Sequence, residues 1–133
     1  MEKTDDTIIA SGPVIIENNK VLLNREQKDY GETPWLFPGG KMETEDIDEE
    51  ACCHREVMEE LGIRVKILKK LLTITEEHDS KKYELHHYLA ERIGDVNCTN
   101  PEIIEWAWHD INNLPDNCMP NVYKIIDYIK KDL

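Results

Sequence analysis

The segment that most constrains the fold is a strongly predicted helix at residues 46–61, "DIDEEACCHREVMEEL". At 100° per residue, this helix places Glu56, Glu59 and Glu60 within one narrow arc. The apolar residues predicted on the opposite side are Ile47, Ala51, Val57, Met58 and Leu61. A helix with one apolar side has to bury it against another element, so the segment predicts a helix packed on a sheet.

Both ends of this helix carry specific signals. Asp46 or Asp48 can serve as the N-cap, because a short acidic side chain accepts a hydrogen bond from a free backbone N–H of the first turn. Gly62 stands where a left-handed residue commonly ends a helix. The helix is therefore predicted to stop directly after its acidic cluster.

The segments around the helix alternate between polar and apolar residues, which predicts strands. Two strands are expected around an Asn18–Asn19 turn, and two more around a polar turn near Asp79 and Ser80. Residues 30–40 are interpreted as a loop with a short strand in it, 101–111 as a further strand and 121–133 as a second amphipathic helix. This order predicts the α/β class, with a sheet flanked by helices.

Chain length and charge exclude several classes of protein. The 133 residues suit a single domain, expected over 1–133. The net charge of −12 disfavours binding to long nucleic acids, which relies on Lys and Arg meeting phosphates. We expect no membrane span and no signal peptide, since "MEKTDDTIIASG" has neither a basic start nor a long apolar run.

The four cysteines are predicted to be reduced thiols of a cytoplasmic protein. Cys52 and Cys53 are adjacent, which makes a poor disulfide pair, whereas Cys98 and Cys118 lie far apart. No CxxC pair is present, and this spacing argues against a metal site built with His54, His86, His87 or His109.

The acidic cluster has two interpretations. Like charges three or four positions apart on a helix cost roughly 0.2–0.5 kcal/mol per pair, so the cluster is either a well-solvated face or a site that binds a cation. The preceding Gly39 and Gly40 free the backbone to approach a ligand or offer a carbonyl oxygen. Carboxylate and carbonyl oxygens suit Mg²⁺ or Mn²⁺, which favours the second interpretation.

Residues 39–63, "GGKMETEDIDEEACCHREVMEELGI", resemble the Nudix box. That signature is a Gly, five residues, a Glu, seven residues, Arg-Glu, an apolar residue, any residue, Glu-Glu, any residue, Gly and an apolar residue. Its second half matches in full, at Arg55, Glu56, Val57, Glu59, Glu60, Gly62 and Ile63. The segments "WLFPGGK" and "IIEWAWHDINNLP" also resemble stretches of Nudix proteins. In this loop-to-helix context the resemblance is specific.

The first half of the box departs from the pattern. Counted from Gly40, the family glutamate falls on Asp46, and eight residues rather than seven then precede Arg55. Counted back from Arg55, the same position falls on Ile47. The simplest explanation is one extra loop residue, with Asp46 or Glu45 replacing the glutamate.

The resemblance implies a fold and a metal site. The fold would be an α/β/α sandwich around a mixed sheet. Nudix proteins typically hydrolyse a nucleoside diphosphate linked to another moiety, with Mg²⁺ or Mn²⁺ as cofactor. By position, Glu56, Glu59 and Glu60 would be metal ligands, joined by the Gly39 carbonyl, while Arg55 would orient Glu56 through a charge-assisted hydrogen bond.

The general base and the substrate contacts stay open. The base is expected to be Glu56 or a carboxylate outside the box, with Glu102 and Glu105 as candidates. Lys41 is a candidate for a phosphate contact and Trp35 for stacking on a base. Phe37, Trp106 and Trp108 are further aromatic candidates, and a core position is an equal interpretation for them.

The expected substrate is a small nucleotide, namely a nucleoside triphosphate, modified or not, cleaved to a monophosphate and pyrophosphate. One alternative is an ADP-ribose-type nucleotide sugar. Another is a non-catalytic Nudix-fold module that binds a nucleotide or a protein, although such a module has no need of all three glutamates. The resemblance also allows a homodimer.

Overall fold

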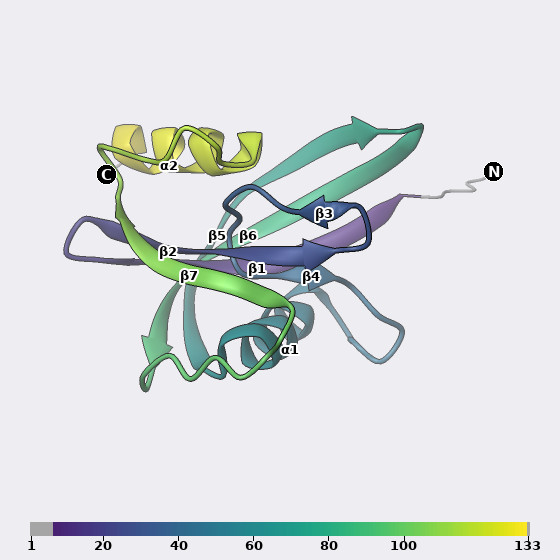
Figure 1. The fold of residues 1–133 in the computed structure, drawn as a ribbon, viewed down its shortest axis with the longest axis horizontal. Coiled ribbons are helices and arrows are strands. Elements are labelled where there is room, and N and C mark those ends of the chain that lie inside the picture. The colour runs from purple at the N-terminus through teal and green to yellow at the C-terminus, as the bar shows by residue number, and fades with distance from the viewer. Residues whose placement is uncertain (1–6, 133) are drawn as a thin grey trace.

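The structure, a computed structural model, describes residues 7–132 as a mixed sheet between two helices (Figure 1). The elements are β1 (Ile8–Glu17), β2 (Lys20–Lys28), β3 (Gly31–Glu32), β4 (Gly40–Lys41), α1 (Glu49–Leu61), β5 (Arg64–His78), β6 (Lys81–Ile93), β7 (Ile103–Asp110) and α2 (Pro120–Asp132). The strand order is β3-β2-β1-β6-β5, with β4 beside β1 and β7 beside β2. Strands β1 and β6 run parallel and the other neighbours antiparallel, so the sheet is mixed.

Both predicted hairpin turns are confirmed. Asn18 and Asn19 have φ values of 52° and 62°, and Asp79 and Ser80 have values of 51° and 67°. Two successive left-handed residues match the right-handed twist of the strands they join, and Asn and Asp tolerate this conformation better than most residues. These turns set the register of β1 with β2 and of β5 with β6.

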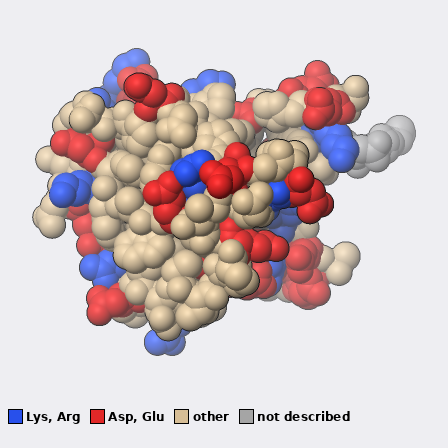
Figure 2. Space-filling model, viewed as in Figure 1, with Lys and Arg blue, Asp and Glu red and all other residues tan. Residues whose placement is uncertain are grey.

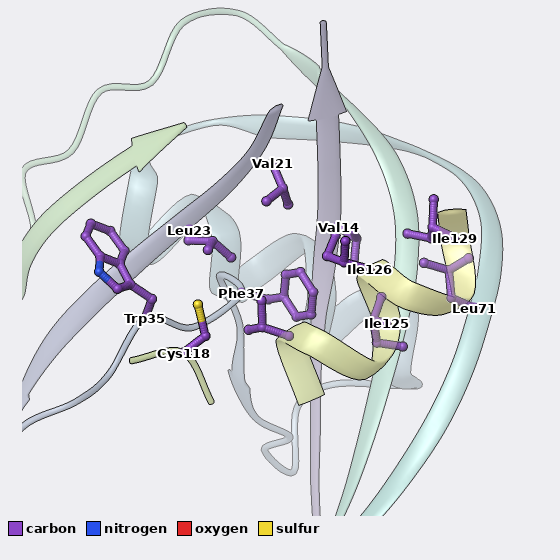
Figure 3. Close-up of a cluster of buried hydrophobic side chains, with 11 residues drawn as sticks. Val14, Val21, Leu23, Trp35, Phe37, Leu71, Cys118, Ile125, Ile126 and Ile129 are labelled. Atoms are coloured by element: carbon purple, nitrogen blue, oxygen red, sulfur yellow. The ribbon is translucent and has the colours of Figure 1, made fainter. Parts of the chain in front are cut away.

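Each face of the sheet is covered by one helix, which confirms the α/β/α sandwich. The neighbouring Val14 and Ile15 are both fully buried, but they belong to different apolar cores because successive strand residues point to opposite faces. The α2 core contains Val14, Phe37 and Ile125 (Figure 3). The α1 core contains Ile15, Leu22, Val57, Leu61, Ile63, Val65 and Ala90. Figure 1 shows α2 and α1 on opposite sides of the sheet.

The central helix keeps its predicted caps but is rotated relative to the prediction. Asp48 is the N-cap and accepts a 2.8 Å hydrogen bond from the Ala51 N–H, whereas Gly62 is left-handed at φ 68°. Ile47 and Met58 were predicted on the packing side, and this is wrong: they are 89% and 44% exposed. Ile47 precedes the helix, which begins at Glu49 rather than at residue 46. The residues that are buried are Cys52, Cys53, Val57, Glu60 and Leu61. One glutamate of the cluster therefore faces the protein interior.

The sheet opens where the glycine loop enters it. Strand β1 pairs with β2 only at Ile16–Val21 and Glu17–Lys20, next to their turn. Farther along, β4 takes the place of β2 beside β1, with Ser11 opposite Gly40. A Cβ on Gly12 would overlap the backbone of Pro38 and Gly39, so the loop lies directly on β1. This contact brings the loop between the sheet and α1.

Cys52, Cys53, Cys98 and Cys118 are free thiols, as predicted. No helix within residues 7–132 is long and apolar enough to cross a membrane. Residues 1–6 and 133 lie outside the described part, so half of the segment on which the signal-peptide expectation rests is not covered, and the single domain over 1–133 stays a prediction.

Candidate active site

Asp46, one of the two candidates for the loop position of the box, lies directly against Arg55. Its Oδ2 lies 2.7 Å from Nη2 of Arg55 and its Oδ1 lies 2.9 Å from Nε, which is a two-point contact between a planar guanidinium and a carboxylate. The Arg55 guanidinium, helped by the N–H of Glu43, lowers the pKa of Asp46 to about 2. Of the two candidate replacements, Asp46 and Glu45, this contact favours Asp46.

Arg55 explains how the helix tolerates its acidic cluster. Besides Asp46, Nη1 of Arg55 lies 3.0 Å from Glu56 and 3.2 Å from both carboxylate oxygens of Glu59. Nη2 also donates to the Lys41 carbonyl at 3.1 Å, which fixes the guanidinium to the glycine loop. One cation thus meets three carboxylates, and the repulsion along the helix is compensated in part within the protein.

Glu56 and Glu60 contact the glycine loop directly. The Gly39 N–H donates to Oε1 of Glu60 at 2.9 Å, and a Cβ on Gly40 would overlap the Glu56 carboxylate. Burial raises the pKa of Glu56 more than Arg55 lowers it. Burial, with a contribution from the charge of Glu26, raises the pKa of Glu60 well above its usual value, although the Gly39 N–H acts against this shift. Two carboxylates are therefore held where negative charge is costly.

Glu26 on β2 is a member of this cluster that the sequence reasoning missed. It is only 5% exposed, its charge acts on Glu56 and Glu60, and its side chain pairs with Lys28 at 2.9 Å. A signal for it existed. Every second residue of a strand points to the same face, so Glu26 shares a face of β2 with Leu22 and Asn24. Leu22 belongs to the α1 core. A glutamate in phase with a core residue is expected to point toward α1.

The donor chemistry fits a hard divalent cation, but the ligands are not assembled. The carboxylates near the glycine loop offer oxygen atoms only, and the raised pKa values of Glu56 and Glu60 reflect negative charge that a cation would stabilise. In the described part of the chain, however, no three His, Cys, Asp or Glu side chains form a group suited to a metal ion. The Arg55 guanidinium lies against both Glu56 and Glu59 and holds their oxygens.

The two candidate bases outside the box are placed differently. The Glu105 carboxylate pairs with Arg25 at 2.6 Å, and the structure does not bring it to the glutamates of α1. Glu102 lies nearer to the cluster. Burial lowers the pKa of Lys28, but the carboxylates of Glu26, Glu102 and Glu60 raise it overall. Glu102 therefore acts on the same lysine as the buried Glu26 and Glu60.

The two candidate substrate contacts also differ. The prediction that Trp35 stacks on a base is wrong, because Trp35 is 8% exposed in the α2 core and its ring packs edge-on against His109 with centroids 4.3 Å apart. Lys41 is exposed and lies beside Gly40, so its phosphate contact stays a prediction. Trp106 is 39% exposed, and Trp108 packs against the α1 core.

A cleft of about 570 Å³ lies on the other side of the glycine loop. Strand β1, the loop, the β5–β6 hairpin and the start of α2 form its walls. Its aromatic and polar lining includes Tyr30, Phe37, Glu76, His78, Asp79, Tyr83, His86, His87 and Asn121. Gly39 and Gly40 also line it, and they are the residues that contact Glu60 and Glu56. The backbone of the glycine loop therefore lies between the cleft and the carboxylates of Glu56 and Glu60.

The NUDIX domain model matches residues 8–129 of this chain. The chain belongs to the Nudix family. An oxidized purine nucleoside triphosphate hydrolase of Danio rerio is 27% identical over 104 residues, which are 77% of this chain and 65% of that protein. An 8-oxo-dGTP diphosphatase of Proteus vulgaris is 33% identical over 83 residues, which are 62% of this chain and 73% of that protein.

The Nudix fold is equally clear in three dimensions. The crystal structure of a MutT NUDIX hydrolase from Burkholderia pseudomallei superimposes with a TM-score of 0.82 at 21% identity, covering 92% of this chain and 98% of that one. The family and the fold predicted from the box are thus confirmed. The predicted enzyme class agrees with the hydrolase and the diphosphatase named among the relatives. The segment 39–63 is hereafter called the Nudix box and α1 the Nudix helix.

Proposed function

We propose that this Nudix protein is a divalent-metal-dependent hydrolase that cleaves a nucleoside triphosphate, modified or not, to a monophosphate and pyrophosphate. The observation that carries the proposal is the shared glycine loop. Gly39 and Gly40 contact the carboxylates of Glu60 and Glu56 and also line the cleft. A nucleotide with its base in the cleft would have its phosphates at the loop, next to the carboxylates.

The cleft suits a flat heterocycle better than a long polymer. Tyr30 and Tyr83 supply aromatic surface, and polar groups of the β5–β6 hairpin and α2 supply hydrogen bonds. Charge supports a small substrate as well: Figure 2 shows Lys and Arg scattered singly among acidic side chains on the face it presents. The names of the two curated relatives favour a purine nucleoside triphosphate, oxidized or not, over a nucleotide sugar.

The metal ligands would be Glu56, Glu59, Glu60 and the Gly39 carbonyl, with Mg²⁺ or Mn²⁺ as the ion. When bound, the ion would neutralise phosphate charge, make phosphorus more electrophilic and lower the pKa of an attacking water. Glu59 is more than half exposed in its side chain and is free to leave Arg55 for this purpose. Arg55 would stay on Asp46 and keep Glu56 in place.

A base for the attacking water would come from Glu56 or Glu102. Burial raises the pKa of Glu56, so in the free protein it binds a proton more readily than an exposed glutamate does. Glu105, held by Arg25, is the weaker choice. The free thiols of all four cysteines suit a reducing compartment, so the proposal includes a cytoplasmic location.

The test is turnover on a panel of nucleoside triphosphates, ADP-ribose and UDP-sugars, with products resolved by chromatography. We expect monophosphate and pyrophosphate from at least one triphosphate in Mg²⁺ or Mn²⁺, and no turnover in excess EDTA. Full activity in EDTA would refute the metal requirement. Turnover of ADP-ribose alone would assign the protein to the nucleotide-sugar class. Binding of nucleotides without turnover at any metal concentration would indicate a non-catalytic module.

A further inference from the structure

His87 on β6 is buried and fixed at both ring nitrogens. It is only 3% exposed, and its ring packs edge-on against Phe37 with centroids 5.6 Å apart. Its Nδ1 lies 2.9 Å from the Leu72 carbonyl oxygen of β5, and its Nε2 lies 3.0 Å from Nδ2 of Asn121 on α2. The side chain thus connects the sheet to the start of the C-terminal helix, at the wall of the cleft.

The partners of His87 determine where its proton lies. A carbonyl oxygen only accepts hydrogen bonds, so Nδ1 has to carry the hydrogen that it donates to Leu72. In a neutral ring, Nε2 then has a lone pair and can only accept. Burial lowers the pKa of His87, which favours the neutral ring.

The tautomer of His87 in turn orients the Asn121 amide. Because Nε2 accepts, the NH₂ end of Asn121 has to face His87, and the carbonyl Oδ1 has to face away from it. Asn121 lines the cleft, and within residues 7–132 its Oδ1 has no hydrogen-bond partner. A backbone carbonyl on β5 therefore determines that Asn121 offers the cleft an acceptor rather than a donor.

The lining of the cleft contains a second hydrogen-bond acceptor, independent of Asn121. Glu76 on β5 also lines the cleft, and its Oε1 pairs with His78 at 3.0 Å. Its Oε2 is buried and has no hydrogen-bond partner among the described residues. A buried acceptor without a partner is costly, so the lining of the cleft contains a second acceptor that lacks a donor.

We propose that Asn121 is a specificity-determining residue whose Oδ1 accepts a hydrogen bond from an N–H group on the base of the substrate, and that His87 is the positioning residue that fixes its amide. This inference rests on the proposed function. The site would select bases that present an amino or lactam N–H toward α2 and reject bases that present a lone pair there. The wrong base would leave a polar group of the site unpaired, which disfavours its turnover.

The test uses pairs of triphosphates that differ in one donor. The pairs are dGTP with dITP, dATP with the triphosphate of purine deoxyriboside, and 8-oxo-dGTP with dGTP. In at least one pair, wild type should favour the donor-bearing member about tenfold in kcat/KM, which corresponds to one hydrogen bond. Asn121→Leu should bring that ratio close to one. A preference that survives Asn121→Leu, or no preference in any pair, would overturn the proposal.

The role of His87 has a readout that does not depend on activity. In ¹⁵N-labelled wild-type protein, a coupling through the hydrogen bond should connect Nδ2 of Asn121 with Nε2 of His87, and the proton of the ring should reside on Nδ1. A proton on Nε2 would contradict the assigned amide orientation. His87→Phe keeps the ring contact with Phe37 but frees the amide, so the base preference should fall although Asn121 is intact. An unchanged preference in a folded His87→Phe variant would remove His87 from the proposal.

Failure of the proposed function gives a different result. A wild type that hydrolyses no nucleotide refutes the proposed activity. The same pairs are then compared by calorimetric dissociation constants for wild type and Asn121→Leu, and equal ratios in the two proteins would refute the role of Asn121.

Discussion

At the residue scale, the site depends on a single arginine that several groups hold in place. Arg55 contacts Asp46, Glu56, Glu59 and the carbonyl of Lys41, and its side chain is only 20% exposed. The two-point contact with Asp46 is the one that sets the plane of the guanidinium. Asp46 therefore has a larger effect on Glu56 than its distance along the chain suggests.

Asp46→Asn should lower kcat by about 10–100-fold, the usual effect of losing a group that orients a ligand residue. The matched control is Glu43→Gln, because Glu43 lies in the same loop, 3.9 Å from Arg55, and is mostly exposed. It should retain near wild-type turnover, and an equal loss in both variants would contradict a specific role for Asp46.

The same variant has a pH signature in stability. Arg55 lowers the pKa of Asp46 from 3.8 to about 2, so the carboxylate stabilises the folded protein above pH 3.8. This contribution is lost as the pH falls through about 2, where the folded protein takes up the proton. The stability difference between wild type and Asp46→Asn, measured by denaturant titration, should shrink over that interval.

At the element scale, the Nudix helix carries two kinds of glutamate. Glu59 is exposed and paired with Arg55, whereas Glu60 is 6% exposed and lies near the charge of Glu26. The helix surface alone makes them equivalent neighbours. The packing of the helix on the sheet distinguishes them.

Glu59→Gln and Glu60→Gln should both reduce turnover by orders of magnitude and reduce the stabilisation by Mg²⁺, if both are metal ligands. In EDTA they should differ. Glu59→Gln should change stability by less than about 0.5 kcal/mol, because it loses an exposed ion pair and relieves a repulsion of similar size. Glu60→Gln should raise the melting temperature by a few degrees, the shift that ~1 kcal/mol gives a domain of this size.

The gain in stability expected from Glu60→Gln should depend on pH. The folded pKa of Glu60 is raised above 4.5, so the unfolded chain loses this proton first, and the folded protein loses stability as the pH rises through the folded pKa. The gain should be largest at neutral pH and above, and small below pH 4.5. Melting curves in EDTA across pH 4–8 measure it, with the exposed Glu91→Gln as control. A drop in stability at neutral pH would contradict the burial of a costly charge.

Two glycines near the loop should respond differently to the same added methyl group. A Cβ on Gly40 meets the end of the flexible Glu56 side chain, so Gly40→Ala should displace that carboxylate and cost activity with little change in melting. A Cβ on Gly12 meets the backbone of Pro38 and Gly39, which cannot move aside, so Gly12→Ala should destabilise the fold by about 1–3 kcal/mol. Measurements of kcat and of the melting temperature on both variants test this difference. Equal destabilisation by Gly40→Ala and Gly12→Ala would contradict it.

The features that were predictable from the sequence are those that depend on near neighbours. The caps at Asp48 and Gly62 and the paired left-handed turns follow from residues a few positions apart. The exposure of Met58 and the burial of Glu60 depend on how the helix meets the sheet, which no local periodicity encodes. The contribution of Glu26 to the carboxylate cluster likewise joins segments 30 or more positions apart.

At the scale of the whole molecule, the chain places its site at an opening of its own sheet. Beyond its two residue pairs with β2, strand β1 pairs with β4 instead. The cleft and the carboxylates of α1 lie on either side of the glycine loop at Gly39 and Gly40. The net charge of the chain, −12, repels polyanions over longer distances. A divalent cation would therefore offset the charge of the protein as well as that of the nucleotide.

The outer strand β5 has a consequence for how copies of this protein meet. It ends the sheet order, its pairing with β6 slips twice, between Ile67 and Lys69 and between Lys70 and Thr73, and Lys66, Lys69 and Lys70 are exposed along it. Irregular backbone and a row of like charges prevent a second sheet from continuing the first. The molecule thus disfavours growth into fibres along β5.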